Sequence, residues 1–234
     1  MQRDVRARRI LALGLALASA TIASVDGAVV AAAGEPAVRA GPAADQPVVL
    51  FLGTSLTAGY GLAVDQAYPA LLQQHIDAAN LNFRVVNAGV SGDTSAGGLR
   101  RLDWLLQLPI AVLVVELGAN DMLRGLDIDA LRDNLAEILR RTRATHPDVR
   151  FAIAGMRAAP NLGSAYGEAF EGVFPAVARE HDAALIPFLL EGVAGEPSLN
   201  QADGIHPTTE GQRRIAKTVW SVLDSMLQTN RREE

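Results

Sequence analysis

A serine, a histidine and an aspartate occupy positions in this sequence that suit nucleophilic catalysis. Ser55 directly follows an apolar run, and Asp203 stands three residues before His206. A serine hydroxyl becomes a useful nucleophile when a histidine accepts its proton, and a carboxylate bound to that histidine fixes its tautomer. One loop turn can aim Asp203 and His206 together. These residues are therefore the candidate nucleophile, orienting acid and base for acyl transfer.

Acyl transfer also builds negative charge on the carbonyl oxygen, so the site must hold hydrogen-bond donors for that oxygen. The candidate donors are the backbone N–H groups of Ser55 and Gly92 and the side-chain amide of Asn120. A glycine at position 92 lets the backbone approach a substrate closely, because it has no Cβ. Removal of one such donor typically costs about 3 kcal/mol of transition-state stabilisation.

Five short apolar runs predict the β-strands that must position these residues. Their composition suits strands buried on both faces of a sheet. Amphipathic segments separate them, and the clearest predict helices over 127–145 and 209–227. Strands that alternate with helices indicate right-handed βαβ units, and hence an α/β domain with a parallel sheet covered on both faces. The predicted strands are Val48 to Leu52, Phe83 to Asn87, Ala111 to Glu116, Val149 to Ala154 and Ala183 to Phe188.

Ligands of such sheets bind beyond the carboxyl ends of the strands, which directs attention to five loops. The fourth loop is small and apolar from Met156 to Gly163 and could line an acyl-chain groove, with Leu123 nearby. We therefore take Leu123, Met156 and Pro160 as candidate substrate-binding residues. The loops span residues 53–62, 88–95, 117–126, 155–166 and 189–208.

Several other residues are expected to support the fold. Thr209 and Gln212 stand at capping-box spacing at the start of the last predicted helix. Asp121 is expected to cap the segment that begins beside it. Trp104 and Trp220 are expected in the hydrophobic core. Asp93 and Thr94 are expected to brace the second loop.

Length and composition favour one acidic globular domain. The chain has 234 residues, 49% of them hydrophobic and 20% charged, and a formal net charge of −5. This size is ordinary for a single α/β domain, and the negative charge argues against binding of nucleic acid. The sequence has no cysteine, which excludes thiolate nucleophiles, disulfides and cysteine-ligated zinc.

The N-terminus has the layout of a secretory signal peptide. Arg3, Arg6, Arg8 and Arg9 precede an apolar run, and small residues follow up to Ala33. The run is shorter than the roughly 20 residues that a membrane anchor needs. We expect a signal peptide over 1–33 with cleavage near Ala33, a flexible leader over 34–47 and one domain over 48–234. The mature protein would then be periplasmic or secreted, without stable membrane insertion.

Specific residues of the sequence argue against other classes of α/β protein. A dinucleotide-binding domain needs a G-x-G-x-x-G pattern and an acidic residue after the second strand, but Gly59-Tyr60-Gly61 does not continue the pattern and that strand ends in Asn87. A P-loop needs a lysine, and the only one is Lys217, in the last predicted helix. The conventional hydrolase pattern G-x-S-x-G lacks its second glycine after Ser55.

Four blocks of the sequence together resemble the SGNH, or GDSL, hydrolase superfamily. They contain Ser55, Gly92, Asn120 and His206 in order, and the stretches VVNAGVSGDTSAGGLRRL, VLVVELGANDMLRG, YGEAF and DGIHP are similar to the periplasmic thioesterase, arylesterase and lysophospholipase subfamily. The resemblance covers residues 48 to 227. It implies a three-layer flavodoxin-like fold and no metal or organic cofactor. It also implies that Ser55 is the nucleophile, that Gly92 and Asn120 complete the oxyanion hole, and that His206 and Asp203 are base and orienter.

Thr54 departs from the pattern of this superfamily. An aspartate usually precedes the nucleophile and supports its loop, whereas this chain has a threonine. The departure bears on reaction rate and loop rigidity more than on mechanism, since a hydroxyl can still form a local hydrogen bond.

The sequence leaves the substrate open. A small-molecule or lipid ester is the expected partner, cleaved by a serine ester hydrolase that acts as a monomer. Aryl esters, acyl thioesters and lysophospholipids all present the same carbonyl group. A carbohydrate O-acetyl esterase of the same superfamily and a non-catalytic binding module on the same fold remain the alternatives.

Overall fold

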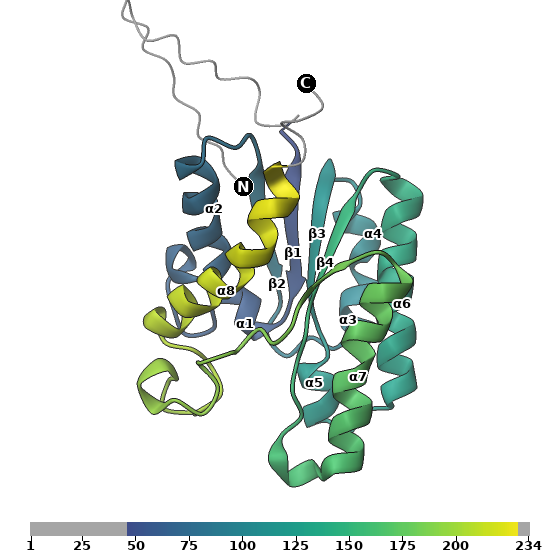
Figure 1. The fold of residues 1–234 in the computed structure, drawn as a ribbon, viewed down its shortest axis with the longest axis vertical. Helices are drawn as coiled ribbons and strands as arrows, with labels where there is room; N and C mark the ends of the chain where they lie inside the picture. Colours follow the sequence, from purple (N-terminus) through teal and green to yellow (C-terminus); the bar gives the residue numbers. More distant parts are fainter. Residues whose placement is uncertain (1–45, 229–234) are drawn as a thin grey trace, which may run out of the picture. The chain divides into compact units, whose positions relative to one another are not determined.

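The computed structural model describes residues 46–228, which form an α/β domain (Figure 1). The predicted signal peptide, its cleavage site and all of the predicted leader before Gln46 lie outside the described residues. Hydrogen bonding of the sheet begins at Pro47, whose carbonyl accepts from the N–H of Arg84. Within residues 46–228, no helix is long and apolar enough to cross a lipid bilayer.

Five parallel strands form one sheet, as the apolar runs predicted, and their order in it is β2-β1-β3-β4-β5. The central strands are buried along nearly their whole length, in keeping with helices on both faces. Each fully buried aliphatic or aromatic side chain contributes about 1.5–3 kcal/mol to folding. The strands are β1 Val48–Gly53, β2 Arg84–Gly89, β3 Ile110–Glu116, β4 Arg150–Ala154 and β5 Ala184–Ile186.

Helices cover the sheet on its two faces. In Figure 1, α2 and α8 lie side by side on one face, and α3, α6 and α7 pack on the other. The helices are α1 Ser55–Ala58, α2 Tyr68–Ala78, α3 Ser95–Arg100, α4 Leu102–Leu105, α5 Ala119–Leu123, α6 Ile128–Thr145, α7 Ser164–Glu180 and α8 Thr209–Gln228. Short 3₁₀ turns span Val64–Gln66, Pro160–Leu162 and Pro197–Leu199.

Two expectations about these helices were wrong. Trp104 is 73% exposed, because α4 turns Leu102 and Leu105 into the core and leaves the indole on the outer side. The start of α8 is capped by Thr208, whose Oγ1 accepts from the N–H of Gly211 at 3.3 Å. Gln212 is buried instead and bonds to two other helices, so it does not close a capping box with Thr209.

The register of the sheet brings the ends of three strands together. Gly53 of β1 is paired with Gly89 of β2 on one side and with Glu116 of β3 on the other. The segments after these strands therefore leave the sheet at the same edge. They carry Ser55, Gly92 and Asn120, respectively.

Candidate active site

Ser55 is the first residue of a short helix at the end of β1. Thr54 caps this helix with its hydroxyl, which accepts from the N–H of Leu56, and Gly59 ends it in the left-handed conformation at φ +73°. The side chain of Asn87 donates to the carbonyl of Thr57 and holds the helix from β2. Within residues 46–228, the Ser55 N–H has no hydrogen-bond partner, so it is available to a ligand.

His206 lies between Ser55 and Asp203. Its Nε2 is 2.9 Å from Ser55 Oγ, and its Nδ1 is 2.7 Å from Asp203 Oδ2. The carboxylate accepts the Nδ1 proton of a neutral imidazole, which leaves the Nε2 lone pair facing the serine hydroxyl. The structure thus brings together the three residues that the sequence singled out.

Asp203 is held as a carboxylate by the loop that carries it. Its Oδ1 accepts from the backbone N–H groups of His206 at 3.0 Å and Ile205 at 2.9 Å. These bonds and the one from the imidazole, with the backbone bond from His206 the largest contribution, hold the pKa of Asp203 well below its usual range. Asp203 is therefore a carboxylate that can accept the imidazole proton.

The loop of His206 is also fixed against the nucleophile segment. Gln201 donates through its amide to the carbonyls of Tyr60 and Pro207, and its own N–H donates to the carbonyl of His206. The Tyr60 ring packs against the imidazole, with 4.4 Å between ring centroids. These contacts join two loops that are distant in sequence and limit the rotation of the histidine.

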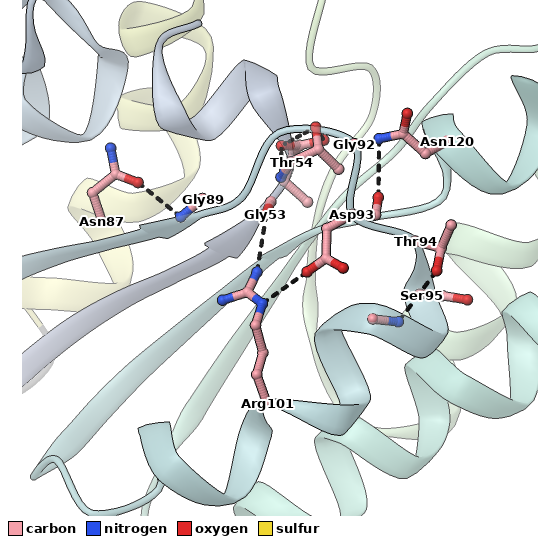
Figure 2. Close-up of polar contacts among 12 residues, drawn as sticks. Gly53, Thr54, Asn87, Gly89, Gly92, Asp93, Thr94, Ser95, Arg101 and Asn120 are labelled. Atoms are coloured by element: carbon pink, nitrogen blue, oxygen red, sulfur yellow. Dashed lines mark hydrogen bonds and ion pairs between the residues drawn. The ribbon is translucent and has the colours of Figure 1, made fainter.

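Gly92 and Asn120 lie in the segments that follow β2 and β3, and Figure 2 shows the Asn120 amide directed at the carbonyl of Asp93, the residue after Gly92. Gly92 has a φ of +79°, a conformation that residues with a Cβ rarely adopt, and its carbonyl accepts from Arg124 at 2.7 Å. Asn120 uses one amide proton to bind the carbonyl of Asp93 at 2.9 Å. Because its amide nitrogen carries two protons, this bond orients the side chain and leaves a second donor.

Arg101 connects this second loop to the end of β1, as Figure 2 shows. Its Nε binds Asp93 at 2.7 Å, and one of its terminal nitrogens donates to the Gly53 carbonyl at 3.1 Å. Thr94 caps α3 by accepting from the N–H of Gly97. The expected bracing by Asp93 and Thr94 is therefore confirmed, and the sequence reasoning missed Arg101, the partner of Asp93.

Asp121 does not cap its own segment, contrary to expectation. Its carboxylate accepts from the N–H and the hydroxyl of Ser95, at 2.9 and 2.5 Å for the shorter contact of each donor. Asn134 donates to the same hydroxyl from α6. The aspartate therefore joins the third loop to the start of α3, because a buried carboxylate needs donors that its own turn does not offer.

Glu116, the last residue of β3, is a buried carboxylate that the sequence reasoning overlooked. It accepts hydrogen bonds from the backbone and hydroxyl groups of Thr54 and Thr57. Burial raises its pKa from 4.5 to about 7, against the opposing effect of these bonds. Its signal in the sequence was one acidic residue at the end of the apolar run VLVV. Thr54, where an aspartate was expected, is one of its partners.

The candidate substrate-binding residues differ in exposure. Leu123 is 60% exposed and Pro160 is also exposed, whereas Met156 is buried and has little surface to offer a ligand. Met122 Sδ accepts from the N–H of Ala159, which joins the third and fourth loops. Arg157 of the fourth loop pairs with Glu191. Among residues 46–228, no group of three or more His, Cys, Asp or Glu side chains could hold a metal ion.

All large exposed hydrophobic side chains of residues 46–228 except Trp104 lie in segments that follow the carboxyl ends of the strands. Tyr60, which packs on the His206 ring, and Ile205, which precedes His206 in the sequence, are among them. The residues are Tyr60, Val64, Val90, Leu123, Leu126, Leu162 and Ile205.

Comparisons with known proteins agree with this geometry. The chain is 44% identical over 180 residues to Esterase TesA of Pseudomonas aeruginosa, covering 76% of this chain and 89% of that protein. It is 41% identical over 175 residues to Thioesterase 1/protease 1/lysophospholipase L1 of Escherichia coli, covering 74% and 82%. A crystal structure of the psychrotrophic esterase EstA from Pseudoalteromonas, inhibited by monoethylphosphonate, matches with a TM-score of 0.73 and 33% identity, covering 78% of this chain and 100% of that one. Residues 51–214 match the model of one family, and the chain belongs to it: the GDSL-like lipase/acylhydrolase family.

Proposed function

We propose that this protein is a serine ester hydrolase that cleaves carboxylic ester or thioester bonds through an acyl-enzyme. The observation that carries the proposal is the continuous contact from Ser55 Oγ to His206 Nε2 and from His206 Nδ1 to Asp203. A nucleophile, a base and an orienting carboxylate in this order perform acyl transfer in many unrelated folds. The names of the relatives, which include esterase and thioesterase, support the same reaction class.

In the proposed mechanism, His206 accepts the proton of Ser55 as the serine oxygen attacks the carbonyl carbon. The carbonyl oxygen becomes an oxyanion that binds the N–H groups of Ser55 and Gly92 and the free amide proton of Asn120. Collapse of this intermediate expels the alcohol or thiol, which takes the proton from His206. Water then repeats the sequence on the acyl-enzyme and releases the acid. The reaction needs a neutral His206, so activity should rise from acidic towards mildly alkaline pH.

We infer that the acyl group of the substrate is apolar. Tyr60 and Ile205 are exposed hydrophobic side chains beside His206, and Leu123 and Pro160 are the exposed members of the proposed acyl groove. Met156 is expected to support that groove from below, because its side chain is buried. Lipid and aryl esters fit such a surface better than the acetyl esters of sugars.

The test is the kcat/KM of residues 34–234 on p-nitrophenyl esters from acetate to palmitate. We expect hydrolysis with an optimum beyond acetate, and loss of at least about a thousandfold in Ser55→Ala. An optimum at acetate would favour the O-acetyl esterase alternative. A fluorophosphonate probe should label wild type and not Ser55→Ala. A protein that neither hydrolyses these esters nor reacts with the probe would be a binding module.

Export is part of the proposal. The full chain, expressed in a Gram-negative host, should yield a periplasmic product that begins near Gly34, which N-terminal sequencing of the purified protein can measure. A version without residues 1–33 should stay in the cytoplasm. Retention of the full chain at its original length would contradict the signal peptide. Light scattering of the mature protein tests the expected monomer.

A further inference from the structure

Glu116 is a buried carboxylate without a basic partner. Its side chain is 1% exposed, and none of the ion pairs among residues 46–228 includes it. Arg101, which lies at the same edge of the sheet, is engaged by Asp93 and the Gly53 carbonyl. A buried charge with no opposite charge must be stabilised by hydrogen bonds, so the donors around it are informative.

All of those donors come from two residues of one turn. Oε2 accepts from the N–H of Thr54 at 2.8 Å, the N–H of Thr57 at 3.3 Å and the hydroxyl of Thr57 at 2.7 Å. The Thr54 hydroxyl lies 3.0 Å from both carboxylate oxygens. Thr54 and Thr57 flank Ser55 in the sequence. The carboxylate therefore binds two residues of the turn that carries the candidate nucleophile.

The hydrogen-bond directions fit the ionised form of Glu116. With Glu116 ionised, the Thr57 hydroxyl donates its proton to the carboxylate and accepts from the Tyr68 hydroxyl at 2.8 Å. Thr54 likewise donates to Glu116 and accepts from the N–H of Leu56. The two backbone N–H groups can only donate to the carboxylate, and both threonine hydroxyls can donate to it as well. Tyr68, from α2, is the titratable group that faces this cluster, and the negative charge of Glu116 adds to burial in raising its pKa.

The surrounding backbone is shaped for this contact. Gly53 pairs with Glu116 in the sheet, and a Cβ on Gly53 would lie 2.7 Å from Glu116 Oε2 and 2.1 Å from Thr57 Oγ1. Only a glycine at this position leaves room for the carboxylate and the hydroxyl to meet. From Glu116 the chain runs four residues to Asn120, so one residue joins the nucleophile turn to the segment that carries a candidate oxyanion donor.

We propose that Glu116 is a positioning residue whose ionised carboxylate holds the Thr54–Thr57 turn, and through it the Ser55 hydroxyl and N–H, in the reactive arrangement with His206. This proposal rests on the proposed ester hydrolysis. Glu116 itself does not contact the serine hydroxyl or the histidine; it acts through the two threonines. Charge-assisted hydrogen bonds are roughly twice as strong as neutral ones, which is why a carboxylate suits this task better than an amide.

The test compares Glu116→Gln, Thr57→Val and their double variant with wild type. The glutamine keeps the shape of the side chain without its charge, and the valine removes one donor without changing the volume much. Active sites are first counted by titration with a fluorophosphonate, so that kcat refers to folded, reactive molecules only. Thr142→Val is the matched control, because Thr142 is also a fully buried threonine but bonds only to the Ile138 carbonyl of its own helix.

We expect kcat per titrated site, and the rate of phosphonylation, to fall roughly tenfold or more in both single variants, with KM within about threefold of wild type. The double variant should be little worse than Glu116→Gln, because both changes break the same contact. Thr142→Val should keep the wild-type rate. A merely structural role would instead lower the number of active sites and the melting temperature, while each remaining site turned over normally.

The outcome that overturns the proposal is a kcat per titrated site within about twofold of wild type in Glu116→Gln. If this variant does not fold, Thr57→Val and Thr54→Val are measured instead. A wild-type kcat per titrated site in both of them would then reject the proposal. If the wild type is active and these variants are equally active, only the proposed role of Glu116 is refuted. A wild-type protein without hydrolysis or labelling refutes the proposed function, and the role of Glu116 falls with it.

Discussion

At the scale of single residues, the candidate site consists of a part that the sequence predicts and a part that it does not. Ser55, Asp203 and His206 could be selected because their residue types and local spacing carry the chemistry. Glu116 and Arg101 could not, because their partners come from other elements and no local pattern joins them. A partly buried ion pair and a buried carboxylate are defined by the fold, so their members look ordinary until the strands are placed side by side.

Asp203→Asn is the sharpest test of the orienting acid. Asparagine can keep its oxygen towards the N–H groups of Ile205 and His206, so the loop should survive. Its amide would then donate to Nδ1 and force the proton onto Nε2, which could no longer accept the serine proton. We expect kcat to fall by about three orders of magnitude or more, with KM little changed. An activity close to wild type in steady-state ester hydrolysis would remove Asp203 from the mechanism.

Asn120→Ala tests the proposed oxyanion donor. The variant removes the second amide proton of Asn120, the one that is not hydrogen-bonded to Asp93. We therefore expect kcat to fall about 10²- to 10³-fold with a small change in KM. Asn134→Ala is the control, because it removes an amide of similar burial that donates to Ser95 Oγ instead. Equal losses of kcat in both variants would indicate a general disturbance of the loops and no specific stabilisation of the oxyanion.

At the scale of elements, the period of the hydrophobic pattern predicted the sheet and the long helices well. The helix predicted over 127–145 is α6, Ile128–Thr145, with its apolar stripe buried. The boundaries were less accurate where local chemistry decides them. β5 stops at Ile186, shorter than predicted, because Pro187 has no N–H to donate to a neighbouring strand. Short helices such as α4 have too few residues to show which side faces the core, which explains Trp104.

Gln212 shows how one side chain joins three elements, and it offers a test at this scale. Its amide accepts from the N–H of Tyr68 in α2 and donates to the carbonyl of Leu56 in α1. Gln212→Ala would leave both buried backbone groups unpaired, so we expect the free energy of unfolding to fall by about 1–3 kcal/mol. Gln228→Ala, which removes an exposed amide bonded to Asp224, should change it by less than about 0.5 kcal/mol in urea unfolding.

At the scale of the whole domain, the charged side chain that is most costly in free energy to bury, Glu116, lies where it can support the candidate site. Stable proteins rarely bury an unpaired carboxylate, and burial raises the pKa of Glu116 because it disfavours the charged form. The domain remains folded despite this cost because the strands of the sheet stabilise it through continuous burial of apolar side chains. A residue that weakens the fold and still completes a hydrogen-bond network around the nucleophile is an expected feature of an active site.

This cost predicts how stability depends on pH. The pKa of Glu116 is about 7 in the folded chain and near 4.5 when unfolded, so the folded state binds the proton more tightly between these values. Ionisation therefore lowers stability as pH rises from 4.5 to 7, by on the order of 3 kcal/mol in total. Glu116→Gln takes up no proton, and all other groups cancel in the comparison. Urea unfolding at pH 5, 6, 7 and 8 should show wild type losing stability relative to the variant as pH rises. A difference that stays constant with pH would mean that Glu116 is ionised throughout, with a pKa that burial does not raise.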